Sequence, residues 1–484
     1  MAIDDAFINP ELELQMHQSN LETGPSYDAV QLQQSINKAD ALLDNLKTDT
    51  EAVTALEAMG DFIKNRTITK TSAILFNIAA EGYGNLSNVD NAKTAFGLES
   101  MTEEDEKLPP QEVNAAMENI AENAMFVMKK LVASLNDSLI ALGDVVHGFD
   151  KNLLSLKKRI ADYEELISDI DGKDELVYNY VKPEKQYVHL MYTDDGFELG
   201  IKPVIQDVRW LYKEHADMVN DSVGKYKSWF NENKDDYLNS SLFSSLEFRP
   251  DDFVLSGSTV FNKSIGNKTP SKASVFYKSK ELPGGKSFYT NVRDTSVRGI
   301  DAVNALMDVN YYLDYHEPDS FRVTEKRLYT VAGMGLLVWA SVMMANPLPM
   351  AFAGLLTKAV ADETKTSDIK KVRVTKDVIF AVLTKDELKE TLAEMKKALS
   401  QLEKWNAQVY KNLWKDQSLR EATRKLTDYI NKEGIDSKNI RYLRNYAVAL
   451  VSLMSKSYTK LHSYGFDVLN ASLSYAEKSA KQYR

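Results

Sequence analysis

Apolar residues recur every three or four positions over much of the chain, the spacing that places them on one face of an α-helix. Near the N-terminus this pattern predicts two short amphipathic helices, over about residues 32–46 and 53–63. After a boundary at Pro109-Pro110, the same steps continue from residue 113 to residue 170. Because their average is close to 3.5 residues, we expect a long helical region with coiled-coil packing. Gly143 and Gly148 are candidate points for a split into two antiparallel helices.

The pattern changes between about residues 176 and 300. Tyr187 to Tyr192 and Phe197 to Ile201 flank Asp195-Gly196, a hairpin signal, and helical spacing returns from Val204 to Phe230. Further strands are predicted over residues 253–261, 273–277 and 287–292, the last two joined around Leu282-Pro283-Gly284-Gly285. We therefore expect a small antiparallel sheet in this section.

From about residue 297 onward, three apolar stripes predict a helical bundle, over residues 297–313, 388–413 and 443–468. The predicted fold is mainly α (α+β), with long helices, a helical bundle and a small antiparallel β section in the middle. We divide the chain into four parts: an acidic helical segment (1–99), a long helical region (100–175), an α+β section (176–300) and a helical bundle (301–484).

Charge is distributed unevenly along the 484 residues, whose formal net charge is −11. Residues 1–99 carry a net charge of −9, whereas residues 365–484 carry a net charge of +10. The basic end predicts contact with nucleic acid or another anionic surface, or pairing with acidic parts of its own chain. The acidic start, Met1 to Asp5, lacks the positive region of a signal peptide.

Candidate catalytic and cofactor chemistry is sparse. With no cysteine, disulfides, thiol nucleophiles and cysteine-ligated metals are excluded. Gly284-Gly285-Lys286-Ser287 lacks the first glycine of a phosphate-binding loop and lies between two predicted strands, so we interpret it as a hairpin turn. No two histidines have a metal-binding spacing, and His215 is expected in the core. Asp169, Asp171 and Asp174 indicate a helix end rather than a calcium loop. We predict no cofactor, no metal and no enzymatic activity. An active site assembled from residues distant in sequence stays an alternative hypothesis.

Residues 328–357 form a run of thirty residues without a charge. Two prolines interrupt the run, so it cannot be one straight helix. Its first arm, residues 328–345, would be about 27 Å long as a helix, close to the thickness of a bilayer core. Two hypotheses are open for residues 328–357: a helical hairpin buried in the protein, or a hairpin that inserts into a membrane. The candidate residues are Leu336, Leu337, Val338, Trp339, Pro347 and Pro349.

The basic C-terminal third also interleaves aromatic residues with its cations, a mixture that can hold phosphates and stack on bases. The other interpretation is that these rings lie in the apolar stripes and the lysines face solvent. The rings concerned are Trp405, Tyr410, Trp414, Tyr429, Tyr442, Tyr446 and Tyr458.

Several short segments and their layout resemble the internal head proteins of giant tailed bacteriophages related to phiKZ. The segments are Thr94 to Ser100, Lys151 to Ile160, Glu281 to Lys286 and Ser474 to Tyr483. The resemblance implies a non-enzymatic structural protein of the virion, inside the capsid, that assembles in the host cytoplasm. Other head proteins and a prohead protease are the implied partners, genomic DNA is a further candidate through the basic region, and ejection with the genome is an additional hypothesis.

A prohead protease of this kind would cut after a small residue, any residue, and then Glu. Gly97-Leu98-Glu99 fits that rule, so the new chain would begin at Ser100; eight triplets in the chain fit it. Loss of residues 1–99 would change the net charge from −11 to −2 and unmask the basic region. The alternative function is a membrane-active or pore-forming helical protein that uses residues 328–357.

Overall fold

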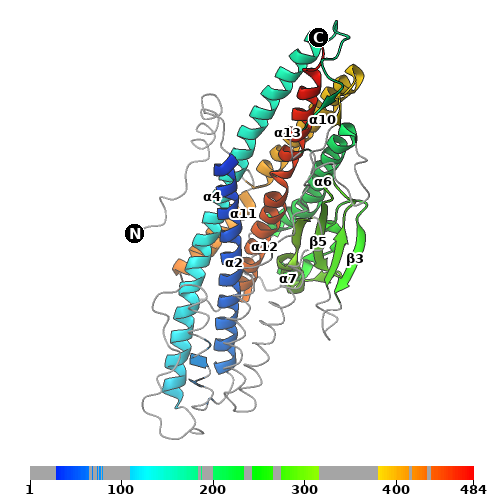
Figure 1. The fold of residues 1–484 in the computed structure, drawn as a ribbon. Coiled ribbons are helices and arrows are strands. Elements are labelled where there is room, and N and C mark those ends of the chain that lie inside the picture. Colours follow the sequence, from blue (N-terminus) through cyan, green and yellow to red (C-terminus); the bar gives the residue numbers. More distant parts are fainter. Residues whose placement is uncertain are drawn as a thin grey trace.

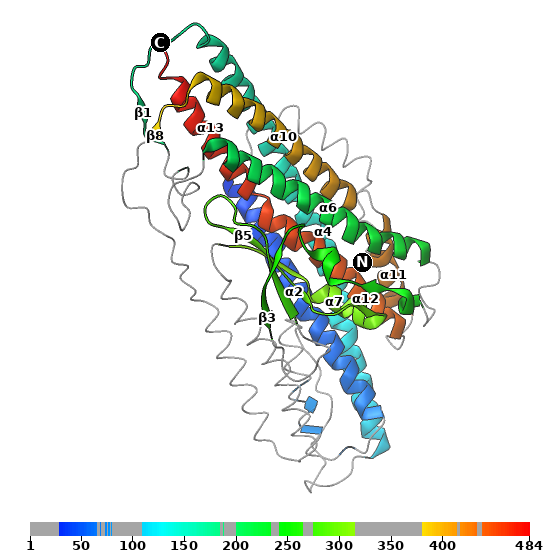
Figure 2. The same ribbon diagram turned by 90° about the vertical axis from the view of Figure 1, so that its right-hand side faces the viewer.

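The computed structural model shows an elongated helical body with a small sheet against one side (Figures 1 and 2). It describes residues 29–64, 68, 73–74, 76–77, 79, 109–183, 187, 200–233, 242–264, 274–314, 380–413, 417–432 and 438–484. The predicted mainly α (α+β) class is therefore confirmed.

The N-terminal half is built on two long helices, α2 (Ala29–Lys64) and α4 (Pro110–Asp169). The two helices pack side by side along the lower part of the molecule in Figure 1. The two short helices predicted near the N-terminus are one continuous helix, α2.

The predicted split of α4 at Gly143 and Gly148 is wrong, because the helix runs unbroken for 60 residues. A glycine inside a helix costs about 1 kcal/mol relative to alanine. Leu142, Val145 and Phe149 are fully buried beside these glycines, and burial of such side chains outweighs that cost.

Helix α6 (Ile201–Asn233) confirms the helix predicted from Val204 to Phe230. Its first residue, Ile201, was expected in a strand; residues 188–199 of that predicted hairpin lie outside the described residues. Two short 3-10 helices follow, η3 (Leu242–Ser245) and η4 (Pro250–Phe253). Phe253, expected to begin a strand, therefore ends a helical turn that starts at Pro250.

The main sheet is antiparallel with the order β3-β4-β5-β7, in which β7 is Asn310–Asp314. It contains the predicted strands β3 (Thr259–Ser264), β4 (Ser274–Lys278) and β5 (Ser287–Arg293). Every residue of β5 is buried. The sheet contacts helices α7 (Ile300–Asp308) and α12 (Lys438–Leu461) through β5 and β7, which places it against the bundle rather than apart from it.

Helix α7 (Ile300–Asp308) occupies only part of the predicted stripe from 297 to 313. The stripe ends in strand β7 (Asn310–Asp314), which the periodicity missed. Phe288 of β5 pairs with Leu313, and its ring stacks on Tyr311 at 5.6 Å. Aromatic side chains favour strands, so the pairing with β5 decides the conformation here.

The C-terminal helices are α10 (Lys385–Leu413), α11 (Gln417–Lys432), α12 (Lys438–Leu461) and α13 (Tyr464–Ala480). Two-residue strand pairs complete the fold: β1 (Tyr180–Val181) with β8 (Phe380–Ala381), and β2 (Glu247–Phe248) with β6 (Val297–Arg298). The stripe predicted from 443 to 468 is divided between α12 and α13 at His462-Ser463.

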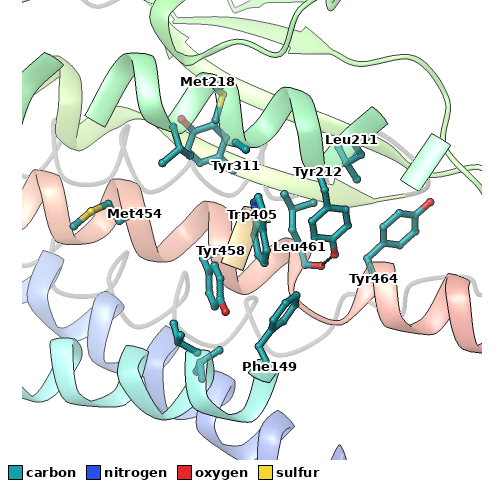
Figure 3. Close-up of a cluster of buried hydrophobic side chains, with 14 of the residues drawn as sticks. Phe149, Leu211, Tyr212, Met218, Tyr311, Trp405, Met454, Tyr458, Leu461 and Tyr464 are labelled. Atoms are coloured by element: carbon teal, nitrogen blue, oxygen red, sulfur yellow. Dashed lines mark hydrogen bonds between the residues drawn. The ribbon is translucent and has the colours of Figure 1, made fainter. Parts of the chain in front are cut away.

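Trp405 of α10 lies at the centre of the core, where α4, α6 and α12 meet (Figure 3). Its ring stacks on Tyr458 at 4.7 Å and meets Tyr212 edge-on at 4.9 Å and Phe149 at 5.2 Å. This large cluster draws residues from α2 through α13, and a smaller cluster joins the C-terminal half of α2 to the start of α4.

Candidate functional site

The candidate processing and membrane residues lie outside the residues that the structure describes. These are Gly97 to Ser100 and the six hairpin residues between Leu336 and Pro349. Within the described ranges, no helix combines the length and the apolar character needed to cross a bilayer.

The glycine-rich segment near residue 284 is a hairpin turn, as predicted. Gly284 and Gly285 have φ angles of 83° and 70°, which glycine adopts without strain. Leu282 donates its backbone N–H to the Lys286 carbonyl at 2.6 Å, and β5 begins at Ser287. A phosphate-binding loop needs a helix after it, and a strand follows here.

His215 is a core residue, as predicted. It is fully buried, and its Nδ1 accepts a hydrogen bond from Trp405 Nε1 at 2.8 Å. Burial lowers the pKa of His215 to about 3. Burial also lowers the pKa of His462 to about 4, although its Nδ1 lies 2.6 Å from the Thr459 carbonyl oxygen. Both rings are neutral at pH 7.

The acidic cluster near residue 171 is a helix end, as predicted. Helix α4 ends at Asp169. Asp171 pairs with Lys389 and Asp174 pairs with Lys385, each at 2.6 Å. In the part of the chain that the structure describes, no three His, Asp or Glu residues gather to hold a metal ion.

The described aromatic residues of the basic C-terminal third are mostly unavailable to bases. Trp405, Tyr446 and Tyr458 are fully buried, and Tyr442 packs against the core. The side chains of Tyr410, Trp414 and Tyr429 lie outside those described. Rings enclosed in a core cannot stack on a nucleic acid, so the core interpretation holds for Trp405, Tyr446 and Tyr458.

Cations of α10 are paired with carboxylates of α4 and of the residues that follow its end. Besides the pairs of Lys385 and Lys389, Lys396 contacts Glu164 at 2.6 Å. These ion pairs are largely exposed, so solvent screens them and each contributes little to stability. They nevertheless neutralise part of the C-terminal positive charge within the molecule.

The buried Arg444 of α12 forms the main charged contact with α2. Its side chain is 0% exposed, and its guanidinium donates to Glu57 Oε1 and Thr54 Oγ1 at 3.0 Å each. Burial lowers the pKa of Arg444, and the Glu57 carboxylate opposes that shift. Arg441 Nε lies 2.7 Å from Glu57 Oε2, so two cations share one carboxylate.

Two more carboxylates of α2 extend this charged contact. Asp40 lies 3.5 Å from Lys460 of α12 and accepts a hydrogen bond from Thr459 at 3.0 Å. Asp49, 1% exposed, lies 3.2 Å from Lys130 of α4. The opposite charges of the two chain ends thus meet inside one molecule, one of the two outcomes that the charge distribution predicted. The particular pairs have no signature in the sequence.

Three of the four segments that carry the family resemblance meet at α13. Arg159 donates through Nε and Nη2 to both carboxylate oxygens of Glu477, at 3.0 and 2.9 Å. Tyr464 donates to the Pro283 carbonyl at 2.9 Å, which ties the turn at 281–286 to the start of α13. Residues 474–483 are the end of α13 and the residues that follow it, whereas Thr94 to Ser100 lie outside the described residues.

The fold and these contacts define a mainly helical α+β protein whose long helices are joined by ion pairs and a large aromatic core. A family model described as phiKZ-like phage internal head proteins matches residues 28–478. The chain belongs to this family, which confirms the resemblance found in the sequence. It is a structural protein of the virion and resides inside the phage capsid. No match was found among curated proteins or among solved structures.

Proposed function

We propose that this internal head protein is cut by a prohead protease after Glu99, in the segment that joins α2 to α4. It then stays in the capsid with other head proteins and enters the host with the genome. Family membership over residues 28–478 supports the role in the head. The folded chain argues against four of the other seven triplets that fit the protease rule.

Four of the eight triplets that fit the protease rule lie wholly within described residues, and all four are in packed structure. Residues 55–57 and 116–118 are inside α2 and α4. Leu246 and Ser279, in the triplets 245–247 and 279–281, are 2% and 4% exposed. A protease binds its substrate as an extended strand, so these positions are protected while the protein stays folded.

Mass spectrometry of purified particles tests the proposal. We expect the chain in the particle to begin at Ser100, and Glu99→Gln to leave it uncut there. Glu118→Gln is the matched control, because Glu118 is an exposed residue of a triplet inside α4. A chain absent from particles, or one that begins elsewhere, contradicts the proposal. Entry into the host is tested by detecting the particle-derived chain in cells infected while protein synthesis is blocked.

We propose that contact with genomic DNA is weak. The described rings at Trp405, Tyr446 and Tyr458 are buried, and Arg444, Lys389 and Lys396 are paired with carboxylates. Cations already paired release fewer counterions from DNA. We expect binding to duplex DNA with a Kd of about 10 μM or weaker at physiological salt, as for non-specific binding. Fluorescence anisotropy with labelled duplex measures it.

A further inference from the structure

Helix α2 covers a surface that we call the α2 seat, formed by residues 116–131 of α4 and residues 441–460 of α12. We propose that a cut between α2 and α4 does not release α2, which stays in this seat as a tightly bound second chain. The proposal takes its biological setting from the processing proposed above. It concerns only the described helices and holds for any cut between them.

Apolar contact runs along the whole of α2. Residues at three- and four-residue steps on one face are buried against α4 and the core: Ile36, Ala39, Leu43, Leu46, Ala52, Val53, Leu56, Met59 and Ile63. Their partners on the α4 side include Ile120, Val127 and Leu131, each 2% exposed or less. Departure of α2 would expose both apolar faces to water, which opposes dissociation.

Charged contacts fix the register of α2 in the seat. Glu57 pairs with Arg444 and Arg441, Asp49 with Lys130, and Asp40 with Lys460. These three carboxylates are spread along α2 from residue 40 to residue 57. A shift of α2 by one helical turn could bring Asp44 and Asp61 to the places of Asp40 and Glu57, but it would move the buried Asp49 away from Lys130. The pair of Asp49 with Lys130 therefore distinguishes the native position of the helix from a position one turn away.

Two consequences follow for the processed protein. The net charge of the particle-bound complex stays that of the uncut chain, because the acidic helix remains. Arg441, Arg444 and Lys460 also stay neutralised, so cleavage does not create a basic surface on α12. This outcome is opposite to the unmasking predicted from sequence charge alone.

An engineered cut tests the proposal without the phage protease. A recognition sequence for a site-specific protease is inserted after Glu99 of the full chain, and the purified protein is cut to completion. We expect both fragments to elute together in size-exclusion chromatography at nanomolar concentration and to separate in denaturant. Elution of the N-terminal fragment alone, with the remainder either folded or aggregated, overturns the proposal. Because the cut is engineered, this result does not depend on where the natural protease acts.

Paired variants test the contacts themselves in the cut complex. Glu57→Gln leaves Arg444 buried without its counter-charge, so we expect the dissociation rate of the labelled N-terminal fragment to rise about tenfold or more. Asp61→Asn is the control on the same helix, because Asp61 is 62% exposed and lies 3.5 Å from Arg441. We expect a change of less than about threefold for it. If Glu57→Gln does not fold, Lys130→Gln removes the ion pair with the buried Asp49 instead. Equal rates in all variants contradict the proposed seat.

Discussion

At the scale of single residues, Tyr212 holds the break between α12 and α13 in place. Its hydroxyl donates to the Leu461 carbonyl at the end of α12 (Figure 3). The same hydroxyl accepts a hydrogen bond from the Gly465 N–H at 2.9 Å. A Cβ atom on residue 465 would lie 2.6 Å from the Tyr212 hydroxyl oxygen. Glycine at 465 is therefore required by this close approach.

Gly465→Ala should lower the free energy of unfolding by about 1–3 kcal/mol, because the added methyl forces Tyr212 out of its position. Gly224→Ala in α6 is the control: apart from the backbone of its own helix turn and its chain neighbours, no atom lies within 4 Å of its Cβ position. Alanine there should raise stability by about 0.5–1 kcal/mol through its helix propensity. Urea unfolding measures both, and equal effects of the two substitutions would contradict the role given to Gly465.

The two buried histidines predict how stability depends on pH. The pKa of His215 is lowered to about 3 and that of His462 to about 4, whereas an unfolded chain titrates each near 6.5. Below pH 6.5 the unfolded state binds the additional protons, so stability falls as the pH drops toward 4. Each histidine contributes a slope of about 1.4 kcal/mol per pH unit.

His215→Gln should reduce that slope by about 1.4 kcal/mol per pH unit between pH 6 and 4.5, since one titrating group is lost. The glutamine oxygen can still accept from Trp405 Nε1. Urea unfolding of both proteins across this pH range checks the result. If the difference in stability between variant and parent does not change with pH, the prediction is wrong.

At the scale of elements, the ion pairs between helices differ in strength. Arg159 of α4 forms a bidentate ion pair with Glu477 of α13 and also donates a hydrogen bond to Asn470 Oδ1 at 3.1 Å. Lys396 makes one contact with Glu164, and both side chains are about half exposed. The planar guanidinium satisfies several acceptors at once, which an ammonium group cannot do in the same geometry.

Arg159→Lys should therefore cost about 1–2 kcal/mol of stability, because it loses the paired hydrogen bonds to Glu477. Lys396→Gln should cost less than about 1 kcal/mol. The shift in thermal midpoint of the two variants measures the difference. A loss for Lys396→Gln as large as for Arg159→Lys would show that α13 is not held by this contact.

The sequence predicted where helices lie more accurately than the residues at which they end. Periodicity located α4, α6 and α10, because apolar steps are a local property of the chain. The break at His462-Ser463 depends on Tyr212, which is about 250 positions away, and β7 depends on pairing with β5. The contact of Arg444 with Glu57 likewise joins residues distant in sequence, so charge totals predicted attraction between the chain ends but not the partners.

At the scale of the whole molecule, the core is divided unequally. The large cluster surrounds Trp405, whereas the smaller one joins residues 52–79 to residues 116–128. Regions with fewer buried apolar neighbours open more readily than the main core. The start of α4 should therefore be less stable locally than its middle.

Hydrogen exchange measured by mass spectrometry should show this order. Amides of residues 116–128 should exchange at least about tenfold faster than those of residues 142–160, a difference of about 1.4 kcal/mol in opening free energy. Both stretches belong to the same helix, so each is the other's control. Equal protection along α4 would indicate a single cooperative unit.

The unbroken α4 also sets the outline of the protein. At 1.5 Å per residue, its 60 residues extend for about 90 Å, and the helix runs from one end of the body to the other in Figure 1. Rod-shaped particles at high concentration exclude less volume from one another when their long axes are parallel. Copies crowded in a closed shell would therefore favour side-by-side alignment.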